Sequence, residues 1–193
     1  MQKSRLETFS DGVFAIAITL LVLNIRIPQT DYEHLLPTLL AAWPQLLGYV
    51  MSFVIVSVYW VSHHNLFHLI RKVDHPSIWM NLLLLLFIGF IPFPTALMGQ
   101  FPFKQMPVII YCSTLLATNL IGFICWKYAA NGHRLIDPNV SRATIRRIDF
   151  SFFIVNLFYL LAIGVSFFSP AASYVVLGLN TLLIILRKPA IEV

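Results

Sequence analysis

Long apolar runs, separated by short polar segments, dominate the chain. Four stretches without Asp, Glu, Lys or Arg cover residues 35–62, 76–103, 105–126 and 150–186, and a shorter one covers 12–25. About 20 apolar residues span the hydrocarbon core of a bilayer as a helix, so the pattern predicts a polytopic, all-α membrane protein. The run from 150 to 186 is too long for one span and is interrupted at Ser169-Pro170, which indicates six helices in total.

Capping residues and prolines predict where these helices begin and end. Ser4 and Glu7 fit a capping box at the start of the first helix, which is expected to end near Ile27 because Pro28 follows. The second helix is expected to start at Pro37 or Pro44 and to run to about Ser62 or one turn beyond. The third is expected to start near Pro76 and to weaken at Pro92 and Pro94, and the fourth to cover 106–128. The last two helices share 150–186, with an external turn at 169–173.

Composition and charge placement support this class. Only 11% of the residues are charged, against about 25% in typical soluble domains, so a soluble enzyme or a nucleic-acid-binding protein is excluded. Eleven of the 13 Lys and Arg residues lie in alternate polar segments: Lys3, Arg5, Arg71, Lys72, Lys127, Arg134, Arg142, Arg146, Arg147, Arg187 and Lys188. The positive-inside rule therefore predicts that both termini are cytoplasmic. The net charge of +5 reflects topology, not a nucleic-acid partner.

The first helix carries the candidate chemistry. Ile16, Leu20 and Leu23 follow one another at i, i+4 and i+7 on one face, with Thr19 beside them. Asp11 is a carboxylate near the membrane boundary and lies about 140° around the helix from Ile16. Two arrangements remain open. Either the apolar stripe faces lipid and Asp11 points into the bundle, or the stripe lines a central axis and Asp11 locks the helix to its own subunit.

A family signature covers the same helix. Residues 5–11, Arg-Leu-Glu-Thr-Phe-Ser-Asp, and the following 12–19, Gly-Val-Phe-Ala-Ile-Ala-Ile-Thr, resemble the first-helix signature of the transmembrane protein 175 family, the endolysosomal potassium channels and their prokaryotic homologues. Trp60-Val61-Ser62-His63, Asn81 and Phe90-Ile91-Pro92 extend the resemblance into the next two helices. It implies one six-helix channel domain over 1–193, as in the single-repeat prokaryotic members.

The resemblance also implies roles for residues of the first helix. Four chains would form a homotetramer whose pore is lined by this helix, with Ile16 as the main hydrophobic constriction and Leu20 and Leu23 as further apolar rings. Thr19 would favour potassium over sodium and contact the ion transiently. Selectivity is expected to be modest, because few oxygen ligands are available. The expected partners are potassium ions, the lipid bilayer of a prokaryotic plasma membrane and further copies of the chain, with no cofactor and no resident metal.

The polar residues of the signature are expected to form a network with the second helix. Its members would be Arg5, Phe9, Ser10, Asp11 and His63, with a hydrogen bond between Asp11 and His63 that could make gating pH-sensitive. The partner of Arg5 and the gating stimulus stay open. Two other functions remain: a small proton-coupled secondary transporter that uses Asp11 and His63 as a relay, and a metal-dependent membrane enzyme. For the enzyme, the i, i+4 pair of His64 and His68 supplies a single metal-binding pattern.

Overall fold

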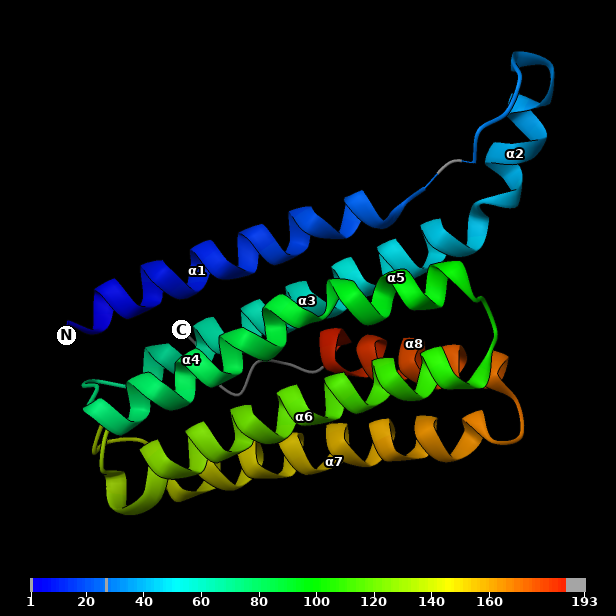
Figure 1. Cartoon of the computed structure of the whole chain (residues 1–193). Coiled ribbons are helices and arrows are strands. Elements are labelled where there is room, and N and C mark those ends of the chain that lie inside the picture. The colour runs from blue at the N-terminus through cyan, green and yellow to red at the C-terminus, as the bar shows by residue number, and fades with distance from the viewer. Residues whose placement is uncertain (1, 27, 187–193) are drawn as a thin grey trace.

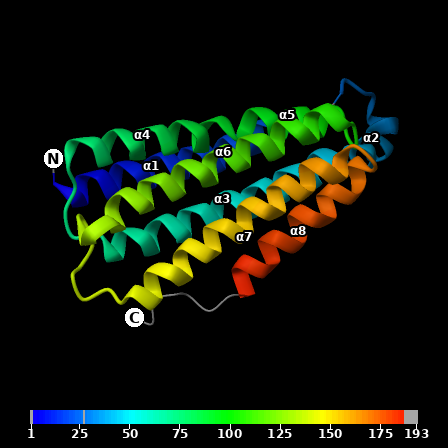
Figure 2. The same ribbon diagram turned by 90° about the horizontal axis from the view of Figure 1, so that it is seen from below.

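Long helices run side by side in the computed structural model, which describes residues 2–26 and 28–186 (Figures 1 and 2). Within that part of the chain, five helical segments are long and apolar enough to cross a membrane. The principal helices are α1 (Lys3–Leu20), α3 (Trp43–Leu69), α4 (His75–Phe90), α5 (Pro92–Gln100), α6 (Gln105–Ala130), α7 (Arg142–Ser166) and the shorter apolar α8 (Pro170–Leu186). The protein is therefore a multi-pass, all-helical membrane protein.

Short elements connect these helices. The 3₁₀ turn η1 (Leu21–Asn24) continues α1, and η2 (Tyr32–His34) leads into the short helix α2 (Leu35–Ala41). A third 3₁₀ turn, η3 (Asn131–His133), follows α6, and Gly132 there has a φ of +59°. A glycine adopts this left-handed conformation without steric cost because it has no Cβ.

The predicted capping box at the start of the first helix is wrong. The helix begins at Lys3, its N-cap is Gln2, and no side chain caps it. Ser4 therefore already lies inside the helix, and Glu7 forms an ion pair with Lys3 at 3.4 Å. The other end also differs, because α-helical geometry stops at Leu20 and η1 carries the chain to Asn24. The predicted end at Ile27 lies outside the described residues.

Prolines divide the third span as the sequence predicted. Helix α4 ends at Phe90, and α5 begins at Pro92 with a second proline at 94. A proline inside a helix removes one backbone donor and clashes with the carbonyl four residues earlier, so the helix is interrupted there. The second span uses Pro44 and not Pro37 in its first turn, and it continues to Leu69, beyond the expected end at about Ser62 or one turn later. Helix α7 begins at Arg142, eight residues before the charge-free run.

The core lies between α1, α3, α4, α5, α6, α7 and α8 and contains hydroxyl groups that bond one another. Ser52 of α3 forms hydrogen bonds with Thr95 of α5 at 2.8 Å and with Tyr111 of α6 at 2.9 Å. The Tyr59 hydroxyl donates to the Leu115 carbonyl at 2.9 Å. Unpaired polar groups are expensive in an apolar interior, so these pairs specify how the helices pack against one another.

The α3–α4 and α6–α7 connections meet at the end of the bundle where the chain begins (Figure 1). An isolated antiparallel bridge joins Ile70 to Ile136. The Arg71 amide donates to the Leu135 carbonyl at 2.9 Å, and the Arg71 side chain pairs with Asp137 at 2.7 Å. Two loops that are distant in sequence are thereby joined by backbone and side-chain bonds.

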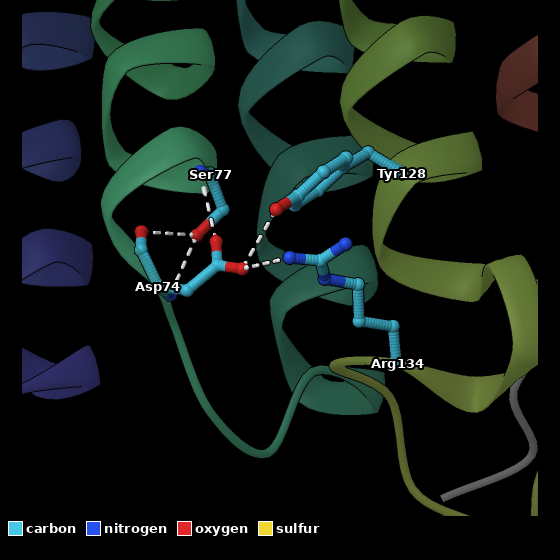
Figure 3. Close-up of polar contacts among 4 residues, drawn as sticks. All are labelled: Asp74, Ser77, Tyr128 and Arg134. Carbon is cyan, nitrogen blue, oxygen red and sulfur yellow. Dashed lines mark hydrogen bonds and ion pairs between the residues drawn. The ribbon is translucent and has the colours of Figure 1, made fainter.

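Asp74 is the centre of a second set of bonds between these loops (Figure 3). It caps α4 by accepting from the Ser77 amide at 3.0 Å. Its other oxygen accepts from the Tyr128 hydroxyl at 2.7 Å and from Arg134 at 3.2 Å, and the Arg134 guanidinium lies over the Tyr128 ring. One carboxylate therefore fixes the start of α4 to the end of α6.

Asp74 is expected to stabilise the protein over a wide range of pH. Desolvation alone would raise its pKa, but the hydrogen bonds from Tyr128 and Ser77 and the Arg134 charge lower it to about 2. A depressed folded-state pKa contributes stability that is complete above the unfolded-state value of about 3.9 and is lost as the pH falls through the folded-state value. We expect Asp74→Asn to lower the melting temperature in detergent at pH 7. The difference from the wild type should persist to about pH 4 and shrink between about pH 4 and 2.

Asp31→Asn is the matched control, because Asp31 is exposed and its side chain does not cap the turn that follows it. If Asp74→Asn and Asp31→Asn have the same melting temperature at pH 7, Asp74 does not hold the two loops together.

Candidate functional site

Helix α1 has one face inside the bundle and one face outside it. Leu6, Ser10, Phe14, Ala17 and Leu21 are buried. They recur every three or four residues and pack against α3 and α4. This face anchors α1 to its own chain, and the opposite side of the helix is exposed.

The exposed face carries the residues that the sequence singled out. Ile16, Leu20 and Leu23 have 61%, 41% and 69% of their surface exposed. Thr19 is exposed as well, and its hydroxyl donates to the Ile16 carbonyl at 2.9 Å. Four neighbouring positions thus form an uncovered stripe that is apolar except for one hydroxyl. Burial in the tertiary structure, which periodicity could not predict, distinguishes this face from the other.

A chain of buried side chains fixes the first half of α1 to α3 and α4. Ser10 is fully buried, and its hydroxyl donates to the Leu6 carbonyl at 2.8 Å. The Asn81 amide donates to the Ser10 oxygen at 3.0 Å, while the Asn81 carbonyl oxygen bonds to His63 Nε2 at 2.9 Å. The His63 ring also stacks on Phe67, with centroids 4.3 Å apart. Asn81 is therefore the central residue of a network that joins three helices.

Asp11 and His63 have separate partners. Asp11 accepts a hydrogen bond from the Trp60 indole N–H at 2.9 Å, whereas His63 bonds to Asn81. The expected Asp11–His63 hydrogen bond was wrong because Asn81 of α4 occupies the position beside the His63 ring. Arg5 and Phe9 are exposed on α1. The structure thus places Ser10, Asp11 and His63 against neighbouring helices, and Arg5 and Phe9 on the open side.

The other end of the first span is held by two polar side chains. The Asn24 amide donates to the Pro92 carbonyl at 2.8 Å, and the Arg26 backbone amide donates to Gln45 Oε1 at 2.8 Å. Gly99 of α5 permits the close approach that places Gln45, because a Cβ at that position would lie 3.3 Å from the Gln45 Cα. The span is therefore anchored at both ends, and the exposed stripe lies between the anchors.

A hollow of about 270 Å³ opens beside the signature residues, between α1 and α3. Its lining includes Glu7, Asp11, His63 and His64. His64 also bonds to His68 through their Nε2 atoms at 2.9 Å. Six of its seven described lining residues are polar or charged, so the hollow is suited to hold water beside Asp11.

Sequence reasoning missed the roles of Asn81, Gln45 and Trp60 in this site. Asn81 and Gln45 both lie in otherwise apolar, charge-free stretches, and a lone amide in such a stretch tends to bond across helices. That signal predicts a bond but names no partner. Trp60 carried part of the family resemblance without a role, and the structure shows that it bonds to Asp11.

These features define a class of protein: a multi-pass helical membrane protein whose first span is anchored through polar bonds and leaves an apolar face open. A sequence model of the family described as "Endosomal/lysosomal potassium channel TMEM175" matches residues 5–92. The chain is 38% identical over 174 residues to "Potassium channel Cha6605_3372" of Chamaesiphon minutus, covering 87% of this chain and 86% of that one. It is 33% identical over 186 residues to "Potassium channel B446_29190" of Streptomyces collinus, covering 94% and 90%.

A solved structure agrees with these relatives. The crystal structure of a "lysosomal potassium-selective channel TMEM175 homolog" from Chamaesiphon minutus superposes with a TM-score of 0.86 at 35% identity, covering 96% of this chain and 97% of that one. The chain belongs to the TMEM175 family of ion channels. This confirms the resemblance found in the first helix.

Proposed function

We propose that the protein is a passive potassium channel of a prokaryotic plasma membrane, formed by four chains of six membrane helices with both termini in the cytoplasm. In this arrangement the exposed stripe of α1 faces the fourfold axis. The observation that carries the proposal is the open apolar face of α1 opposite the buried Ser10–Asn81–His63 network. The potassium-channel relatives and the matching channel structure support it.

The bond between Asp11 and Trp60 supports the choice of face. A carboxylate close to the apolar run is costly in lipid unless it is paired or wetted. Asp11 is paired within its own chain and lies beside a polar hollow. The stripe carrying Ile16 is therefore free to meet the same stripe of other copies.

Four Ile16 side chains around an axis would form a gate that closes by excluding water. A hydrated cation cannot pass an apolar constriction cheaply, so conduction requires that α1 move or rotate enough to admit water. Leu20 and Leu23, further along the same exposed face, would lengthen the dry segment. The α-helix ends at Leu20 and a 3₁₀ turn begins at Leu21, so the helix geometry changes between Leu20 and Leu23.

Thr19 would supply oxygen ligands to a passing potassium ion. Its hydroxyl proton is directed to the Ile16 carbonyl, which leaves lone pairs of the hydroxyl oxygen free to face a cation. Four such oxygens replace only part of a hydration shell. Selectivity for potassium over sodium is therefore expected to be modest.

Thr19→Ala is expected to reduce the preference for potassium. If the contact between the Thr19 hydroxyl and potassium is worth about 0.5–1.5 kcal/mol, its loss lowers the potassium-to-sodium permeability ratio by about two- to tenfold. The shift in reversal potential under a potassium/sodium gradient measures this ratio. Thr114→Ala on α6 is the matched control, because its hydroxyl also bonds a helix carbonyl, at 2.8 Å, away from α1. Equal reversal potentials for the two variants would remove Thr19 from the selectivity mechanism.

Planar-bilayer recording of the purified protein tests the channel itself. A channel gives unitary currents with a reversal potential that follows the potassium gradient. The alternative, a proton-coupled transporter with Asp11 and His63 as a relay, gives slow uptake that depends on the proton gradient. The separate partners of Asp11 and His63 argue against a direct relay between them. Coupled uptake without unitary currents would refute the channel.

A further inference from the structure

A second hollow, of about 530 Å³, lies between the end of α6 and the start of α7. Lys127, His133 and Arg142 contribute to its lining, and none of its seven described lining residues is acidic. Lys127 is paired with Asp149 at 3.0 Å. Arg142 has no ion pair or hydrogen-bond partner for its side chain among residues 2–26 and 28–186. The hollow therefore offers uncompensated positive charge at the basic end of the bundle.

An exposed apolar surface continues directly from this charge along α7. Arg142, Arg146, Phe150, Phe153 and Leu157 follow at spacings of four, four, three and four residues, which places them on one side of the helix. All five are exposed. Two cations at the end of a membrane span, followed by large apolar side chains, match the chemistry of a phospholipid: a headgroup at the interface and acyl chains beneath it.

The position of α7 gives lipid access to this surface. Helix α7 packs against α6 and α8 and lies on the opposite side of the bundle from α1 (Figures 1 and 2). If α1 lines the central axis, α7 faces outward, so this step rests on the proposed function. Basic pockets between membrane helices on the cytoplasmic side bind anionic headgroups.

We propose that the hollow binds the phosphate of an anionic phospholipid, with Arg142 as the main contact and Arg146 beside it. The acyl chains lie along Phe150, Phe153 and Leu157. Lys127 adds positive charge to the lining of the hollow, reduced by its pairing with Asp149. The exposed apolar side chains of α7 favour a lipid over free phosphate, because free phosphate has no acyl chains to pack against them.

Native mass spectrometry of the purified full-length protein tests the proposal. The probes are dioctanoyl phosphatidylglycerol, dioctanoyl phosphatidylcholine and sodium phosphate. Phosphatidylglycerol should be retained and phosphatidylcholine should not. Loss of both arginines in Arg142→Gln/Arg146→Gln should reduce phosphatidylglycerol retention by about tenfold or more, since charge-assisted contacts are lost. The charge-conserving Arg142→Lys/Arg146→Lys variant should keep most of it.

Arg71→Gln/Lys72→Gln is the control that removes the same two positive charges, because Arg71 and Lys72 are exposed in the α3–α4 connection and do not line the hollow. It should retain lipid as the wild type does. Equal retention of the two lipids, or unchanged retention in the Arg142→Gln/Arg146→Gln variant, would overturn the site. Complete displacement of phosphatidylglycerol by millimolar phosphate would show a free-phosphate site and overturn the lipid assignment.

Potassium flux in reconstituted vesicles separates this proposal from the proposed function. Flux without selective lipid retention rejects the lipid site and leaves the channel in place. Selective lipid retention without flux rejects the channel and supports the headgroup site on its own.

Discussion

Replacing Ile16 with asparagine is expected to raise potassium flux through reconstituted protein by about tenfold or more, equivalent to lowering the barrier by about 1.4 kcal/mol. In the proposed tetramer the change places four amides at the narrowest apolar ring. An amide hydrogen-bonds water, so the ring no longer excludes it, and a cation keeps part of its hydration while passing. Flux is measured as potassium release from vesicles at equal protein density.

Ile124→Asn is the matched control for this substitution. Ile124 lies on α6 and is exposed to a similar extent, 57% against 61% for Ile16. Both variants place the same amide on an exposed helix face, so nonspecific disturbance of the bilayer should be alike in the two. If Ile16→Asn and Ile124→Asn release potassium equally, the stripe of α1 is not the constriction.

Replacing Asn81 with alanine is expected to lower the free energy of unfolding by about 2–4 kcal/mol. The substitution leaves His63 Nε2 without its partner in a buried site, which costs about 1–3 kcal/mol. It also removes one of the two hydrogen bonds of the Ser10 hydroxyl, worth about 0.5–1.5 kcal/mol. Loss of the central residue also removes the link between α1 and α4, so the open probability of the channel should change together with stability. Unfolding followed by circular dichroism in detergent measures the first effect, and bilayer recording measures the second.

Asn139→Ala is the control for the amide, because Asn139 is exposed in the α6–α7 connection. It should change the free energy of unfolding by less than about 0.5 kcal/mol. A destabilisation of Asn81→Ala no larger than this would mean that water replaces the lost amide. The network would then not hold α1 in position.

Together these two substitutions separate the two faces of α1. The exposed face is expected to control conduction with little effect on folding, since Ile16 packs little within its own chain. The buried face is expected to control folding first and conduction through the position of the helix. If Ile16→Asn mainly lowered stability and Asn81→Ala mainly raised potassium flux, the exposed face would control folding and the buried face conduction.

The apolar pattern and the signature established much of this before the fold was known. Charge-free runs indicated a multi-pass helical protein because a bilayer sets the length of an apolar helix. Pro92 and Pro94 located the break in the third span because proline cannot continue the hydrogen-bond ladder. Residues 5–19 identified the family because the order of polar and apolar residues in them is specific. These are local properties, and a single segment expresses them completely.

Contacts between segments required the tertiary structure. The sequence offered Asp11 and His63 as a pair, but which side chain bonds which depends on where α4 presents Asn81. The uncovered side of α1 depends likewise on what α3 and α4 bury. Periodicity gives the angle between two side chains on one helix and says nothing about the neighbours that each will meet. Composition and pattern determined that this chain enters a membrane as helices, and packing decided which face of the first helix is left open, because burial is a property of all the helices together.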